Sequence, residues 1–143
     1  MTSIIDEIEG SEVTFFKNGK KKTIDIGKLF NIDEDNLTKE FANQASLYAY
    51  FSTLQADIER NLAIISIKRD QEYASADEYH RHYLDKREKK YTEAVIKSLV
   101  IRTEEYMIVD QEFVDATYDL NVIKAIVRAL QMRAEMLISI GLS

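Results

Sequence analysis

Two basic clusters contain the residues whose types and spacing best suit a binding function. The first is Lys20-Lys21-Lys22, and the second is Lys86-Arg87-Glu88-Lys89-Lys90, with Lys68 and Arg69 upstream of it. Proteins that bind single-stranded nucleic acid combine a cationic track for phosphates with aromatic faces for bases, and tyrosines accompany the second cluster. The candidate nucleic-acid-binding residues are Lys20, Lys21, Lys22, Lys68, Arg69, Lys86, Arg87, Lys89 and Lys90. The second cluster is interleaved with Tyr79, Tyr83 and Tyr91, and Tyr73 lies near Lys68 and Arg69.

A plainer interpretation of the same residues remains open. Lys and Arg also solubilise ordinary helix surfaces, and Tyr is often a half-buried boundary residue. If several copies of the chain form a ring, however, even a modest basic cluster repeats around the axis, and the avidity of the assembly for a strand multiplies.

Catalysis and metal binding find little support in the residue pattern. There is no Cys, no serine-hydrolase motif, no phosphate-binding Gly loop and no zinc-protease motif. On a helix, His82 could share a metal with Glu78 or Asp85, but a solvated polar segment is the simpler interpretation. We therefore expect a protein that is not an enzyme, with no catalytic residues, no cofactor and no metal.

The composition indicates a globular helical protein of one domain, residues 1–143. Hydrophobic residues make up 45% of the chain and charged residues 31%, a balance that excludes a disordered chain. With no Pro and only four Gly, long helices can run uninterrupted. The net charge of −6 argues against bulk electrostatic binding of nucleic acid but leaves room for local basic stripes. The predicted fold class is mainly α, a bundle of long helices with a small N-terminal β-hairpin, in an oligomer.

The absence of Cys, of a secretory signal and of a long apolar run predicts a cytoplasmic protein that does not span a membrane.

The predicted hairpin covers about 12–26, because Asn18-Gly19 lies between two β-prone runs and suits a tight turn. A short connecting turn over 28–32 follows it. The helical body then covers about 34–141. Its first helix is expected over about 34–73, which is about 60 Å, whereas a globule of this size is about 30 Å across. Such a helix would protrude or lie along a neighbouring subunit. Residues 73–91 could be a bent continuation of this helix or a charged crossover.

The last part of the chain carries the strongest helical pattern. Apolar residues recur in steps of four and three at Val109, Phe113, Ala116, Leu120, Ile123, Val127, Leu130, Ala134 and Leu137. This period predicts a long helix packed along another helix. A shorter helix is expected before it, with Thr92 as its N-cap. Further apolar residues lie off this seam. We expect Val122, Ile126, Met132 and Met136 to face a neighbouring subunit.

Two stretches, Asn31–Tyr48 and Tyr106–Asp110, resemble parts of the phage recombination mediators of the UvsY type, which would place a phage-encoded chain in the cytoplasm of its host cell. Asn31–Tyr48 resembles the opening of that family's long helix, and Tyr106–Asp110 resembles the entry into its C-terminal helix. The resemblance covers 31–67 and about 90–141. The basic positions of the family's DNA-contacting motif are Ala74 and Ala76 here, so that motif's role does not carry over to them.

The resemblance implies a non-enzymatic, ring-like homo-oligomer that binds single-stranded DNA. Such proteins help a RecA-like recombinase to replace single-strand-binding protein on the DNA. The alternative is a structural or protein-recruiting helical oligomer without DNA affinity, which the acidic total and the missing motif favour.

Overall fold

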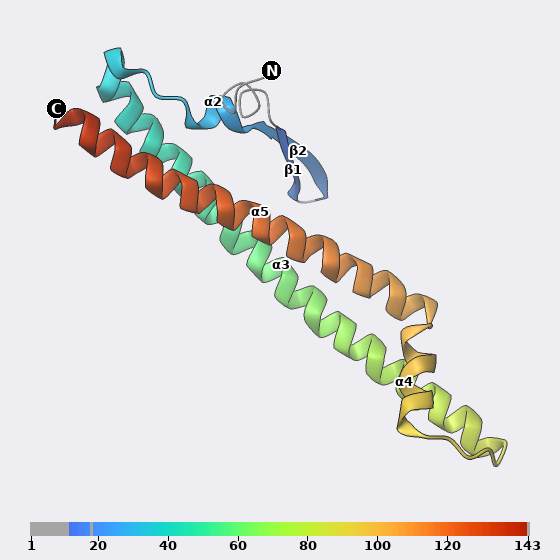
Figure 1. The fold of residues 1–143 in the computed structure, drawn as a ribbon. Coiled ribbons are helices and arrows are strands. Elements are labelled where there is room, and N and C mark those ends of the chain that lie inside the picture. The colour runs from blue at the N-terminus through green and yellow to red at the C-terminus, as the bar shows by residue number, and fades with distance from the viewer. Residues whose placement is uncertain (1–11, 18, 143) are drawn as a thin grey trace, which may run out of the picture. The chain divides into compact units, whose positions relative to one another are not determined.

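The computed structural model describes residues 12–17 and 19–142. Its elements are β1 (Glu12–Lys17), β2 (Lys20–Asp25), α2 (Ile26–Phe30), the short 3-10 helix η1 (Glu34–Asn36), α3 (Leu37–Lys86), α4 (Glu93–Ile101) and α5 (Glu104–Gly141) (Figure 1). The predicted fold class, mainly α with a small N-terminal hairpin, is confirmed. None of the helices within the described residues is long and apolar enough to cross a membrane.

The chain divides into two compact units. The first unit contains the residues up to Ile58 and those from Asp119 onward, and the second unit is Glu59–Tyr118. Both long helices contribute to both units. The hairpin, α2 and η1 belong to the first unit, and α4 belongs to the second.

The hairpin of the first unit is a two-stranded antiparallel sheet in which Val13 lies opposite Ile24 and Phe15 opposite Lys22. Side chains alternate between the two faces of a strand. Phe15 is therefore buried while its neighbour Phe16 is exposed. Gly19 has a φ of 75°, the left-handed conformation that the predicted tight turn requires, and Asn18 lies outside the described residues.

The link from the hairpin to α3 is more ordered than the sequence predicted. Residues Ile26–Phe30 form α2, so the expectation of a simple turn over 28–32 is wrong. The helix can begin there because the side chain of Asp25 accepts a hydrogen bond from the backbone N–H of Lys28. Asp33 caps η1 and Asn36 caps the start of α3 in the same way, by accepting hydrogen bonds from the backbone N–H groups of Asp35 and Lys39.

In the first unit, α3 and α5 are antiparallel and bury the predicted seam of α5. Ile123, Leu130 and Leu137 are fully buried, as is Leu54 of α3. A buried polar group lies among them: the Arg133 guanidinium forms an ion pair with Glu40 and donates a hydrogen bond of 2.8 Å to Gln44 Oε1. The Gln44 amide in turn donates to the backbone oxygen of Leu130 at 2.7 Å.

In the second unit, α3 continues through residues 73–86 as a regular helix and ends at Lys86. The expected end of the first helix near residue 73 is therefore wrong. Residues 73–91 could have been a continuation of this helix or a charged crossover, and they continue the helix as far as Lys86. The chain then turns, and Thr92 caps α4 by accepting a hydrogen bond from Val95 N at 3.2 Å, as predicted. A core of Ala76, Ile96 and Val100, with Tyr73, Leu84 and Tyr91 packed against it, joins α4 to α3.

Candidate nucleic-acid interface

The last turns of α3 and the residue that follows the helix carry an exposed row of two tyrosines and one arginine. Tyr79, Tyr83 and Arg87 follow one another at intervals of four residues, which places them on one side of a helix. The two tyrosine rings are stacked, with centroids 6.3 Å apart and planes inclined by 27°. The Arg87 guanidinium carbon lies 3.7 Å from the Tyr83 ring centroid. We call these three residues the aromatic ladder.

The end of α3 and the turn after it add further positive charge close to the aromatic ladder. Lys86, the last residue of α3, and Lys89 and Lys90 of the turn are all exposed. The helix ends in a Schellman arrangement, in which Lys89 N donates to Leu84 O at 3.1 Å and Glu88 N donates to Asp85 O at 3.0 Å. Glu88 occupies the left-handed position with a φ of 54°, where Gly is usual. The second basic cluster is thus a structured turn.

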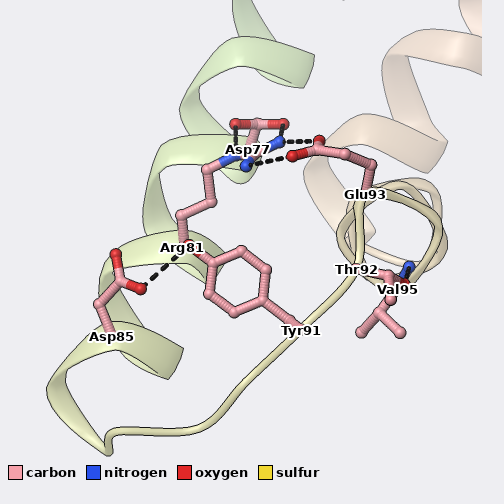
Figure 2. Close-up of polar contacts among 7 residues, drawn as sticks. All are labelled: Asp77, Arg81, Asp85, Tyr91, Thr92, Glu93 and Val95. Carbon is pink, nitrogen blue, oxygen red and sulfur yellow. Dashed lines mark hydrogen bonds and ion pairs between the residues drawn. The ribbon is translucent and has the colours of Figure 1, made fainter.

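An ion-pair clamp fixes the other end of this turn. Figure 2 shows Arg81 of α3 between two carboxylates, Asp77 one helical turn earlier and Glu93 in the first turn of α4. Arg81 Nε donates to Asp77 Oδ1 at 2.7 Å, and Arg81 Nη1 donates to Glu93 Oε1 at 3.0 Å. The hydrogen bonds with Glu93, and then those with Asp77, raise the pKa of Arg81. The hydrogen bond from Arg81 lowers the pKa of Glu93.

Tyr73 and Tyr91 have structural roles instead of forming part of the exposed surface. Both are partly buried against the core of the second unit. The Tyr91 hydroxyl donates to Asp85 Oδ1 at 3.0 Å, and this hydrogen bond raises the pKa of Tyr91 (Figure 2). The Tyr73 ring packs edge-on against Tyr106, with centroids 5.7 Å apart. For these two tyrosines, the boundary-residue interpretation describes their position.

Lys68 and Arg69, which the sequence placed among the binding candidates, face carboxylates of α5. Lys68 Nζ lies 3.6 Å from Glu112 Oε2, and Arg69 Nη1 lies 3.4 Å from Asp110 Oδ1. Arg69 also stacks over the Phe113 ring at 3.7 Å. Because their charges are paired within the unit, we do not include them in the proposed interface.

The lysine triplet of the hairpin is exposed but does not form a single patch. In the strand register Lys22 lies opposite Phe15, Lys21 opposite Phe16 and Lys20 opposite Lys17. Successive residues of a strand point to opposite faces, so Lys21 points away from Lys20 and Lys22. The triplet belongs to the first unit, whereas the aromatic ladder belongs to the second.

Of the four residues that the sequence predicts to face a neighbouring subunit, three are exposed or half-buried in the single chain and one is buried. Met132 and Met136 are 61% and 58% exposed, and Val122 is half-buried. Ile126 is buried within the chain, so its assignment to an outward-facing surface is wrong. With Ala125 and Ala129, the remaining three recur in steps of three and four along α5. We call Val122, Ala125, Ala129, Met132 and Met136 the outer stripe of α5.

The two histidines differ in their surroundings. His80 Nε2 lies 3.4 Å from Thr103 Oγ1, and its ring packs edge-on against Tyr79 at 5.3 Å. His82 is exposed. Within the part of the chain that the structure describes, no group of three or more metal-ligating side chains comes together.

Sequence reasoning missed the residues that give the turn its form. Asp77 and Arg81 are four apart on a helix, a spacing that could have revealed half of the clamp. Glu93 is twelve residues further along, so only the fold brings it to Arg81.

No protein-family model, no curated protein and no solved structure matches the chain.

Proposed function

We propose that this chain is the subunit of a helical homo-oligomer that binds single-stranded DNA through the turn between α3 and α4. In this proposal it acts as a recombination mediator, helping a RecA-like recombinase to replace single-strand-binding protein. The recombinase step rests on the resemblance of Asn31–Tyr48 and Tyr106–Asp110 to the UvsY-type mediators.

The observation that carries the DNA-binding part is the aromatic ladder together with Lys86, Lys89 and Lys90. Exposed tyrosine rings offer faces to bases, and Arg87 can add a cation–π contact while reaching a phosphate. The clamp between Arg81 and Glu93 supports the proposal because it holds the turn in place before any strand arrives, which lowers the entropic cost of binding.

Fluorescence anisotropy of a labelled single strand over a series of salt concentrations tests this interface. Lys89→Glu combined with Lys90→Glu should weaken binding and should also flatten the dependence of affinity on salt, by about 0.7 in the logarithmic slope for each lost phosphate contact. Lys39→Glu combined with Lys124→Glu is the matched control, because both lysines are exposed in the first unit and the charge change is the same. Absence of binding at low salt, with the assembly intact, would remove the DNA-binding part.

The rival function is a structural or protein-recruiting oligomer without DNA affinity. The observation that favours it is the exposed apolar surface of α5, where Met132 and Met136 lie uncovered. The two functions separate in the experiment above, because the rival predicts no binding by the wild-type assembly at any salt concentration.

A further inference from the structure

The second unit contains a hollow beside the aromatic ladder, with a volume of about 500 Å³. This lies within the range of about 300–1,000 Å³ that is typical of sites for small molecules. Its walls come from α3, α4 and the first turn of α5. The residues that line it are Glu72, Ser75, Ala76, Tyr79, His80, Leu99, Arg102, Thr103 and Glu105.

The hollow and the aromatic ladder share Tyr79. Its ring stacks with Tyr83 on one side and contacts the ring of His80, another wall residue, edge-on. A base that stacks on the exposed Tyr79 ring therefore lies at the rim of the hollow. Ala76 and Leu99 add apolar surface there, as the faces of a planar aromatic ring require.

The charges of the walls do not suit a phosphate. Two carboxylates, Glu72 and Glu105, face the hollow against one guanidinium, that of Arg102. A phosphodiester would meet like charge there, whereas Lys86, Arg87, Lys89 and Lys90 around the turn offer it opposite charge. A neutral ligand with both hydrogen-bond donors and acceptors on one edge matches the mixture of carboxylates, guanidinium and hydroxyls.

We propose that the hollow takes one unstacked nucleobase of the bound single strand and selects bases that carry an exocyclic amino group. This inference rests on the proposed DNA binding. Cytosine fits both kinds of wall group: its N4 amino group donates to a carboxylate of Glu72 or Glu105, and its carbonyl oxygen accepts from Arg102. Thymine has a carbonyl oxygen, an acceptor, where cytosine has its N4 amino group, so a carboxylate placed at that position loses water and gains no hydrogen bond from it.

The test compares the affinities of oligo(dC), oligo(dT) and a strand of abasic sites for the assembled protein, all of one length. The wild type should bind oligo(dC) about tenfold more tightly than the abasic strand and severalfold more tightly than oligo(dT). Ser75→Leu places apolar bulk at the exposed mouth of the hollow, and Leu is a good helix former. This variant should lose the preference for oligo(dC) over oligo(dT) while its affinity for the abasic strand stays unchanged.

Ala74→Leu is the matched control, because Ala74 is an exposed neighbour on α3 that does not line the hollow. It should keep the preference of the wild type. If the wild type binds oligo(dC) and oligo(dT) equally, or if Ser75→Leu keeps the preference, the hollow is not a base site and DNA binding at the turn still stands. If none of the three strands binds, both proposals fall.

Discussion

Glu88 shows how one residue shapes the turn that carries the basic cluster. Its φ of 54° lies in the left-handed region, which costs a residue with a Cβ about 1 kcal/mol relative to Gly. The two Schellman hydrogen bonds over Leu84 and Asp85 hold it there. Glu88 also places a carboxylate among three lysines and an arginine, which reduces the positive charge of the turn.

Glu88→Gly should raise the free energy of unfolding by up to about 1 kcal/mol, because Gly adopts the required conformation without strain. It should also tighten binding of single-stranded DNA, since it removes a negative charge from the turn. Urea denaturation followed by circular dichroism measures the first effect. Glu78→Gly is the control, since Glu78 is exposed in the interior of α3 and Gly there should destabilise by about 1 kcal/mol. Equal losses in both variants would contradict the role given to Glu88.

Leu130 lies at the centre of the buried seam in the first unit. Its side chain is completely buried, so Leu130→Ala should lower the free energy of unfolding by about 2–5 kcal/mol through lost contacts and the cavity left behind. Arg128→Ala, two residues away and exposed, should change the stability of the subunit by no more than about 0.5 kcal/mol. Chemical denaturation at a protein concentration that holds the oligomeric state constant distinguishes the two. A similar loss for both would mean that the subunit does not bury Leu130 selectively.

The residues of this seam could be predicted, but those beside it could not. The steps of four and three select Ile123, Leu130 and Leu137 because such a period keeps one face of a helix toward its partner. Ile126 and Arg133 each lie three residues after a seam residue, Ile123 and Leu130 respectively. At such positions the spacing of apolar residues does not show whether a side chain is buried or exposed. Burial of Arg133 depends on Glu40 and Gln44, which lie about ninety residues earlier in the chain. No local pattern indicates that pairing.

At the level of elements, the junction between α3 and α4 depends on the clamp that Arg81 forms. Glu93 has a pKa below its ordinary value, chiefly because its carboxylate accepts hydrogen bonds from Arg81. A carboxylate with a lowered pKa in the folded state stabilises the fold at pH values above its ordinary pKa. That contribution declines as the pH falls below about 4.5 and through the pKa of the folded state.

Glu93→Gln should therefore lower the melting temperature at neutral pH, and the difference from the wild type should shrink as the pH falls below about 4.5. Thermal unfolding followed at a series of pH values measures this convergence. Glu78→Gln changes the charge equally at an exposed position in α3 and should not show the same pattern. A difference for Glu93→Gln that stays constant down to pH 3, about a unit below the ordinary pKa of a Glu carboxyl, would show that the ion pair does not stabilise the fold.

The length of α3 illustrates what the pattern of apolar residues can and cannot predict for an element. The helix was expected to end near residue 73 because the apolar period fades there. It continues to Lys86 because polar residues support a helix through contacts four residues apart, as Asp77 and Arg81 do. Its end is also hard to read from the sequence, since Glu88 and not Gly occupies the left-handed position. The basic cluster was predicted, but its form as a structured turn was not.

At the scale of the whole molecule, the apolar surface that the subunit leaves exposed requires an explanation. The outer stripe of α5 recurs in steps of three and four, the same period as the buried seam, and its two methionines are more than half exposed. Contiguous apolar surface of this kind marks sites of association in proteins that are otherwise well folded. A further copy of the chain is the proposed partner, in agreement with the expectation of an oligomer.

Light scattering at micromolar concentration should therefore give a mass well above the 16.6 kDa of one chain. Met136→Lys should reduce that mass toward the monomer while the far-ultraviolet circular dichroism stays helical, because a charge on the outer stripe must lose its water when the stripe is covered. Glu135→Gln changes the net charge by the same amount at an exposed neighbouring residue and should leave the mass unchanged. If Met136→Lys keeps the wild-type mass, the outer stripe does not form the contact between subunits. If the wild type itself scatters as a monomer, the proposed oligomer is wrong, and the turn between α3 and α4 must bind DNA without avidity.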